Sequence, residues 1–240
     1  AYYVIFNLGL YRRADGSLDW GAILRYSDGG LAIYGAILSS LVVLLIFCRV
    51  RKISFLSFAD LGVHGLFIGQ LIGRWGNFMN VEAYGGPTAL PWRMCGESIA
   101  RNMLDQGYVD QAGYQAILSG NLGVHPTFLY ESLWNLAGLF LVYHLGKKRR
   151  FDGQCFLFYV FWYGLGRAWI EGLRTDSLYL YEGSAIRVSQ LLAALSALIA
   201  LGATIWMWRR SKQHPVSLYV DRLAQQQASQ AEPEQPEEKE

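Results

Sequence analysis

The stretch LAIYGAILSSLVVLLIFC, residues 31–48, decides the fold class, because it carries no charge and is followed at once by RVRK. An α-helix rises 1.5 Å per residue, so a run of this length reaches about 27 Å, close to the hydrocarbon thickness of a bilayer. We therefore predict that this stretch crosses a membrane as a helix and that the basic residues after it lie at the membrane surface.

The composition of the whole chain agrees with that prediction. Of the 240 residues, 52% are hydrophobic and only 17% are charged, whereas about a quarter are charged in soluble domains. The net charge is +2, but ten of the 21 Lys and Arg residues stand in three clusters, at 49–52, 147–150 and 209–212. Each cluster follows an apolar run, which indicates membrane topology rather than nucleic-acid binding.

Five apolar stretches follow one another along the chain, and each is predicted to form a membrane-spanning helix. The second, third and fourth stretches carry charges within the apolar run. The five stretches are residues 31–48, 53–73, 127–146, 154–173 and 188–208. We therefore predict an all-α integral membrane protein, a polytopic helical bundle of about five spans.

The basic clusters also predict the direction of each span. If all three clusters lie in the cytoplasm, as positive residues near spans usually do, the five spans alternate in direction without conflict. The loops at 9–30, 80–126 and 174–187 then lie on the periplasmic or external side. Residues 1–212 would form the membrane-embedded domain.

The two ends of the chain differ from this domain. Residues 213–240 end in QQQASQAEPEQPEEKE, and a segment dominated by Gln, Glu and Pro cannot bury enough apolar surface to fold. We predict that it is a disordered cytoplasmic tail. Residues 1–8, AYYVIFNL, look like the end of a hydrophobic helix that begins further upstream, because no basic region or cleavage site marks a signal peptide.

The richest group of polar residues lies in GRWGNFMNVEAYGG, residues 73–86, directly after an apolar run. It places Arg74, Asn77, Asn80 and Glu82 at the mouth of a predicted span, where such residues are costly without partners. An Arg beside amide groups in a low-dielectric pocket suits an anionic head group. The alternative is an ordinary polar loop that caps a helix.

A second group lies in and after the fourth span. Tyr163, Arg167, Glu171 and Arg174 are separated by steps of four, four and three, so one helical face would carry all four side chains. Ionisable residues inside a span usually mark a pathway or a site. The alternative is that Arg167 and Glu171 only neutralise each other. We expect Arg174 near the outer surface, where it could meet phosphate head groups.

Three further patterns leave their alternatives open. In HPTFLYE, residues 125–131, His125 stands at a helix entrance, whereas Tyr130 and Glu131 equally fit interfacial anchoring and helix-start chemistry. Asp60 and His64 are read as an internal polar pair rather than a site. The three cysteines, Cys48, Cys95 and Cys155, form no spacing with His or carboxylates that predicts a metal site.

Together these motifs resemble the prolipoprotein diacylglyceryl transferases of the bacterial plasma membrane. The similarity runs in order from residue 1 to about residue 210, and every fixed position of the family pattern G-R-x-G-N-F-x-N-x-E-x-x-G is present. The segments that carry it are DGGLAIYGA (28–36), GRWGNFMNVEAYGG (73–86), HPTFLYE (125–131) and GRAWIEGLRTD (166–176).

The resemblance implies a multi-pass enzyme of seven helices, about two of them upstream of Ala1. It implies transfer of the diacylglyceryl group of phosphatidylglycerol to the lipobox cysteine of a prolipoprotein, with a thioether formed and glycerol phosphate released. This is the first step of lipoprotein maturation. The expected partners are phosphatidylglycerol, the prolipoprotein signal peptide and membrane lipids. We expect no cofactor, no metal and no nucleic acid.

The resemblance also implies roles for particular residues. Arg74 matches the arginine that binds phosphatidylglycerol, and Arg167 matches a second essential arginine. The remaining matches lie in the same signature and in the late helix. They are Asn77, Glu82, Gly85, Tyr163 and Glu171.

One departure from the family affects the proton acceptor. Where well-known members have His-Gly-Gly, this chain reads Tyr34-Gly35-Ala36, so a histidine base cannot be assigned there. A phenol of reference pKa about 10 is a poor base, and we expect Tyr34 to hydrogen-bond the lipid instead. His125 is the available imidazole. A lipid or anion transporter that uses Arg167 and Glu171 as a gate is the rival hypothesis, although no repeated halves are visible.

Overall fold

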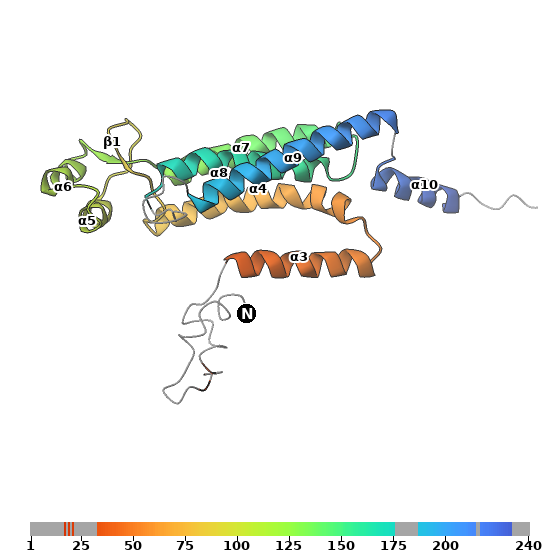
Figure 1. Ribbon diagram of the computed structural model, residues 1–240, viewed down its shortest axis with the longest axis horizontal. Coiled ribbons are helices and arrows are strands. Elements are labelled where there is room, and N and C mark those ends of the chain that lie inside the picture. The colour runs from red at the N-terminus through yellow and green to blue at the C-terminus, as the bar shows by residue number, and fades with distance from the viewer. Residues whose placement is uncertain are drawn as a thin grey trace, which may run out of the picture. The chain divides into compact units, whose positions relative to one another are not determined.

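The computed structural model describes residues 17, 19, 21, 33–175, 187–214 and 217–231 (Figure 1). The chain forms two compact units, residues 1–58 and 59–240, and each is considered by itself. The described part is almost entirely helical, with one two-stranded sheet. The predicted all-α class is therefore confirmed in its main feature.

The main helix of the first unit is α3, Ile33–Val50, which covers the predicted span at 31–48. It ends in a Schellman turn just after the first basic cluster begins. The Ile53 N–H donates to the Cys48 carbonyl at 2.9 Å, and Lys52 adopts a positive φ of 55°. This closure satisfies the last carbonyls of the helix and turns the chain sharply.

Four long helices form the body of the second unit and lie side by side in Figure 1. Three of them correspond closely to predicted spans, and α4 runs further than predicted, beyond residue 73 to Met79. The helices are α4 (Phe55–Met79, whose first turn belongs to the first unit), α7 (Thr127–Gly146), α8 (Gln154–Ile170) and α9 (Val188–Gln213).

Small residues allow α8 to approach its neighbours closely, as is common between helices in membranes. A Cβ at Gly166 would overlap the Trp134 indole of α7, and one at Gly164 would lie 2.6 Å from the Ala193 carbonyl of α9. Trp134 stacks on Trp162 with ring centroids 4.3 Å apart, and each indole N–H donates to the other residue's carbonyl.

A buried carboxylate fixes the other end of α8. Asp60 of α4 accepts hydrogen bonds of 2.9 Å from the backbone N–H groups of Gly153 and Phe156. It therefore caps the N-terminus of α8, where a negative charge complements the helix dipole. His64 contacts the Leu61 carbonyl and not Asp60, so the predicted Asp60–His64 pair is wrong. Asp60 is nevertheless an internal structural residue, as predicted.

A small cap of short elements stands at one end of these helices (Figure 1). Its core contains Tyr84, Ile99, Met103, Ile117 and Val124. The two strands pair antiparallel, with Pro87 opposite Val124. The elements are β1 (Pro87–Thr88), α5 (Glu97–Asp105), α6 (Gln111–Leu118) and β2 (Gly123–Val124).

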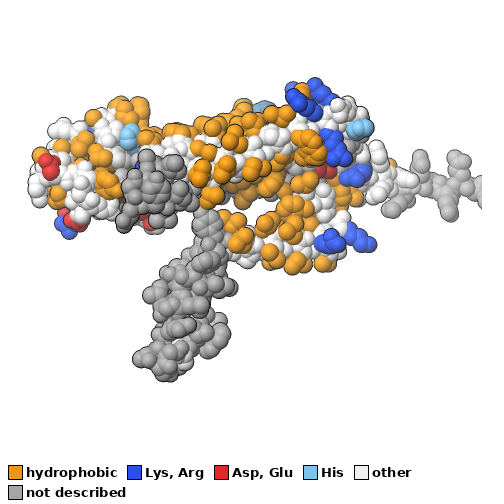
Figure 2. All heavy atoms as spheres, viewed as in Figure 1, with side chains coloured by type: hydrophobic (Ala, Val, Ile, Leu, Met, Phe, Trp, Pro, Cys, Tyr) orange, Lys and Arg blue, Asp and Glu red, His pale blue; other side chains and the backbone are white. Residues whose placement is uncertain are grey.

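The outer surfaces of the long helices are apolar, as Figure 2 shows. On α9, for example, Leu198 is 66% exposed and Ile199 is 72% exposed. Within the described residues, α4 and the stretch Ser189–Gln213 are long and apolar enough to cross a membrane, and Gly35–Val50 is a shorter apolar helix. Lys and Arg side chains gather near the end of α9 in Figure 2.

The tail corrects one prediction. Residues Tyr219–Ala231 form a further helix, α10, within the segment whose composition predicted disorder. Its first residue is anchored to the turn before α8, because the Tyr219 N–H donates to the Asp152 carboxylate at 3.0 Å. Arg222 also lies 4.0 Å from Asp152. A cap and an ion pair at its first turn thus stabilise a helix that composition alone disfavours.

Candidate active site

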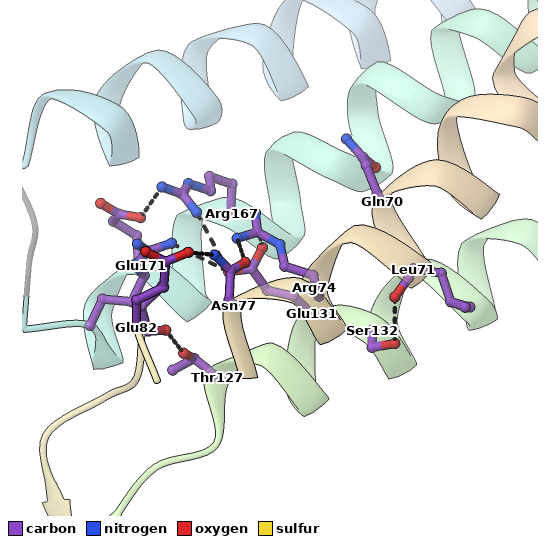
Figure 3. A network of polar contacts seen from close by, with 12 residues as sticks. Gln70, Leu71, Arg74, Asn77, Glu82, Thr127, Glu131, Ser132, Arg167 and Glu171 are labelled. Atoms are coloured by element: carbon purple, nitrogen blue, oxygen red, sulfur yellow. Dashed lines mark hydrogen bonds and ion pairs between the residues drawn. The ribbon is translucent and has the colours of Figure 1, made fainter. Parts of the chain in front are cut away.

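Three arginines from different parts of the chain converge on the carboxylate of Glu131 (Figure 3). Arg74 Nη2 lies 2.5 Å from Oε2, Arg167 Nη1 lies 3.5 Å from Oε1, and Arg174 Nη1 lies 3.7 Å from Oε1. The Glu131 side chain is 7% exposed, and the three arginine side chains are 11–20% exposed. Charges held this far from water interact more strongly than at an open surface.

The helix ends explain why these residues meet. Arg74 lies in the last two turns of α4, Glu131 lies in the second turn of α7, and Arg167 lies in the last turn of α8. Because α4 continues to Met79, Arg74 and Asn77 belong to a helix, so the alternative of an ordinary polar loop does not hold for these two residues. Three packed helices therefore place the charged groups at one level of the bundle.

Glu171 extends the cluster beyond the end of α8. It forms an ion pair of 2.6 Å with Arg167, as the spacing of four predicted. Its other oxygen accepts a 2.7 Å hydrogen bond from Ser189 of α9. Arg167 is therefore held between two carboxylates, on α7 and at the start of the short 3-10 helix η3 (Glu171–Leu173).

The single helical face predicted for residues 163–174 is only partly present. The α-helix ends at Ile170, and Arg174 has an extended backbone after η3. Arg174 still reaches Glu131 because its segment folds back beside Gly85. Its side chain is 11% exposed, and its expected place near the outer membrane surface stays a prediction.

The end of α4 and the residues directly after it form a rim beside this cluster. Arg74 Nη1 donates to Asn77 at 3.3 Å, and the amide groups of Asn77 and Asn80 donate to Glu82 at 3.0 and 3.2 Å. Glu82 lies between Val81 and Ala83, which both have φ of 55°. Backbone in this region is costly for residues other than glycine, and such strain often accompanies functional sites.

Gly85 lies where three backbone segments cross. Its N–H donates to the His125 carbonyl at 2.9 Å, and a Cβ there would lie 2.7 Å from both the His125 side chain and the Leu173 carbonyl. Close packing of the backbone thus explains why residue 85 is a glycine, and no ligand contact is needed to explain it. Thr127 fixes the same crossing by donating to the Ala83 carbonyl. Contact between Gly85 and a substrate stays a prediction.

A pocket opens beside the charged cluster, between α7 and α8. Tyr163 lies one helical turn before Arg167 on the pocket wall, as its spacing predicted. The lining residues are Glu131, Trp134, Asn135, Tyr163, Gly166, Arg167 and Ile170.

His125, the available imidazole, lies beside Tyr130, whereas Tyr34, the expected lipid contact, belongs to the other unit. The His125 ring contacts the Tyr130 hydroxyl at 3.3 Å, and that hydroxyl also accepts a 2.9 Å bond from Trp92. Burial lowers the pKa of His125 below its ordinary value of 6.5, because desolvation disfavours the imidazolium. Tyr34 is the second residue of α3, in the other unit, and its side chain lies outside the described residues.

Glu131 is the residue that sequence reasoning left undecided and the structure places at the centre. Its signal was present in the charges: three arginines near membrane depth need buried counter-charges, and Glu131 stands at a span entrance in HPTFLYE. Its position one residue after Tyr130 made interfacial anchoring an equally good reading. Only the packing of α4 and α8 against α7 shows that Glu131 belongs to the charged cluster and is not simply an interfacial residue at a helix start.

Long apolar helices with exposed apolar surfaces, together with a buried arginine–carboxylate cluster at one end, are typical of a membrane protein. The family model described as prolipoprotein diacylglyceryl transferase matches residues 1–208. The chain therefore belongs to the prolipoprotein diacylglyceryl transferase family.

Individual relatives agree with this assignment. A phosphatidylglycerol–prolipoprotein diacylglyceryl transferase of Lysinibacillus sphaericus is 40% identical over 220 residues, which cover 92% of this chain and 74% of the relative. The corresponding proteins of Listeria innocua and Geobacillus kaustophilus are 40% and 39% identical over 222 residues, covering 92% of this chain and 73% and 74% of the relatives.

Proposed function

We propose that this chain transfers the diacylglyceryl group of phosphatidylglycerol to the lipobox cysteine thiol of a prolipoprotein, the activity that the names of its relatives describe. The observation that carries the proposal is the convergence of Arg74, Arg167 and Arg174 on Glu131. Guanidinium groups in a partly buried site are the side chains best suited to hold a phosphodiester.

The reaction needs a site that stabilises a departing phosphate. The substrate thiolate attacks the glycerol carbon that bears the phosphate ester, a C–S bond forms, and the C–O bond breaks. The electron pair of that bond passes to the phosphate oxygen, and glycerol phosphate leaves. Arginines held in place before the reaction stabilise the charge that grows on those oxygens. Their positive field also lowers the pKa of a nearby thiol.

Each arginine has a separate part in this scheme. Arg74 and Arg167 come from different helices and are both oriented by Glu131, so they can grip one phosphate from two sides. Glu171 fixes the second edge of Arg167. Arg174 supplies further positive charge at a longer distance from Glu131. Asn77 and Glu82 hold the rim, where Arg74 is fixed by the Asn77 amide.

The thiol proton must pass to a base. His125 is the candidate imidazole, and its lowered pKa keeps it neutral and able to accept a proton at neutral pH. Its contact with Tyr130 gives it a fixed orientation. We propose Tyr34 as a lipid contact. We also propose that Tyr163, on the pocket wall, contacts the substrate.

The test of the activity is chemical. The protein, reconstituted in membranes that contain phosphatidylglycerol, is incubated with a lipobox peptide and with the same peptide in which Ser replaces Cys. We expect the mass of the Cys peptide to rise by one diacylglyceryl group and that of the Ser peptide to stay unchanged. A chain that moves lipid between leaflets but never modifies the Cys peptide would be a transporter, and the proposal would fail.

We propose a multi-pass arrangement in the bacterial plasma membrane, with five spans in this chain, the cap outside and the C-terminal tail in the cytoplasm. The basic clusters at 49–52, 147–150 and 209–212 support this orientation. Cys95, which is exposed, should react with a membrane-impermeant thiol reagent in intact cells. A cysteine introduced by Lys148→Cys should not react, and the opposite labelling pattern would reverse the orientation.

A further inference from the structure

Two cations from different elements lie against one indole ring at the end of α9. Lys212 Nζ of α9 lies 3.6 Å from the ring centroid of Trp208, and the guanidinium carbon of Arg150, from the turn before α8, lies 5.9 Å from the same centroid. Because both distances end at one ring, the two charges lie within about 10 Å of each other, a separation at which surface charges still repel. The ring attracts each cation but neutralises neither.

Carboxylates do not balance these two charges. Among the residues that the structure describes, neither Arg150 nor Lys212 forms an ion pair. Asp152, the acidic residue nearest to Arg150 in the sequence, accepts a hydrogen bond from the Tyr219 N–H at 3.0 Å and lies 4.0 Å from Arg222. An anion that bridges the two cations would relieve their repulsion and form charge-assisted hydrogen bonds with both.

Local packing holds both cations in place. The Arg150 N–H donates to the Gln154 side chain at 2.8 Å, and Phe151, the next residue, is 5% exposed. The turn that carries Arg150 is therefore anchored at the start of α8. Lys212 lies one helical turn after Trp208 on α9. A site whose groups are ordered before binding loses less entropy when its ligand arrives.

An exposed apolar strip on α9 leads to the two cations and indicates the kind of anion. Leu201, Ile205, Trp208 and Lys212 are separated by steps of four, three and four, so they share one helical face. The first three are 40%, 44% and 40% exposed. A phosphate held by the cations could therefore continue into acyl chains along this strip, which favours a lipid over a free anion. Two cations on one ring also favour an anionic head group over one that carries an ammonium group.

We propose that Arg150, Trp208 and Lys212 form a binding site for the phosphate of an anionic phospholipid in the leaflet at this end of α9. The bound phosphate joins the turn before α8 to the end of α9. The site is separate from the arginine cluster around Glu131, because Arg150 precedes α8 whereas Arg167 lies in its last turn, about 20 Å further along the helix. Figure 1 shows the end of α9 far from the cap. The proposal is therefore independent of the proposed function.

The test measures lipid binding by the full chain in detergent, with the lipids bound to each protein counted by native mass spectrometry. The probes are dioleoyl phosphatidic acid, dioleoyl phosphatidylcholine and inorganic phosphate. In the double variant Arg150→Gln/Lys212→Gln, one phosphatidic acid per protein should bind about tenfold or more weakly than in the wild type, because two charge-assisted contacts are lost. Phosphatidylcholine should bind the two proteins equally, and millimolar inorganic phosphate should not displace the lipid.

Arg209→Gln/Arg210→Gln is the matched control. It removes the same charge from the same end of α9, and Arg210 also lies over an indole, at 5.5 Å from the Trp206 centroid, but this pair is formed within one helix. The control should bind phosphatidic acid as the wild type does. Equal weakening in both double variants, or none in either, would overturn the proposal, as would displacement of the lipid by inorganic phosphate. Should a double variant lose stability, Lys212→Gln and Arg210→Gln alone provide the same comparison.

Discussion

Replacing Arg74 with Lys keeps the positive charge near the end of α4 but removes the planar guanidinium fork. Arg74 uses two different nitrogens, one 2.5 Å from Glu131 and one 3.3 Å from Asn77. A single ammonium group cannot hold both partners in that geometry and also share two phosphate oxygens. One charge-assisted hydrogen bond contributes about 1.5–3 kcal/mol, so its loss in the transition state should slow turnover by roughly ten- to over a hundredfold.

The assay for Arg74→Lys is the release of glycerol phosphate at equal amounts of folded protein, with phosphatidylglycerol varied to separate kcat from KM. A loss confined to the transition state lowers kcat, whereas uniform loss of binding raises KM. Arg167→Lys should be impaired similarly, and Arg174→Lys less, because its contact with Glu131 is longer, at 3.7 Å. Near-normal turnover of Arg74→Lys would refute the proposal that Arg74 holds two phosphate oxygens at once. Arg74 would then have only a structural role.

Three other perturbations test the geometry. Glu131→Gln leaves three guanidinium groups without their shared carboxylate, so the free energy of unfolding should fall by about 3 kcal/mol. Added sulfate should raise the unfolding temperature of this variant more than that of the wild type. Equal sulfate effects on the two proteins would contradict the role of Glu131 as the shared counter-charge. Gly166→Ala should destabilise the protein by about 1–3 kcal/mol, because the new Cβ overlaps Trp134. Gly202→Ala is the control and should not destabilise it, because a Cβ there meets nothing within 4 Å. Equal unfolding temperatures for the two variants would argue against close packing at Gly166. Burial lowers the pKa of His125 below 6.5, so the fold disfavours the protonated ring. Wild-type stability should therefore fall as the pH drops below about 6.5, and that of His125→Gln should fall less. Parallel pH profiles for the two proteins would show that His125 does not cause the loss.

The helices could be predicted from sequence because each depends on a local pattern. All five predicted helical stretches are present, since long uncharged runs leave few alternatives to helix. Their ends were harder to predict, because ends depend on partners. The second helix runs on to Met79, and the fourth changes to a 3-10 turn at Glu171. Both differences lie at the site, where tertiary contacts override local preference.

Most members of the charged cluster could be selected from sequence, but its centre could not. Arg74, Arg167 and Glu171 were selected because charged residues in apolar runs are conspicuous, and the structure brings them together around Glu131. Glu131 was ambiguous because a helix entrance explains an acidic residue equally well.

The most direct test of the account is a double-mutant cycle between Arg74 and Arg167, measured as kcat for glycerol phosphate release. If both arginines hold one phosphate through their shared contact with Glu131, the double Lys variant should be much less impaired than the product of the two single effects predicts, because residues that act as a unit are not additive. Independent effects that multiply fully would contradict a single phosphate site formed by both arginines.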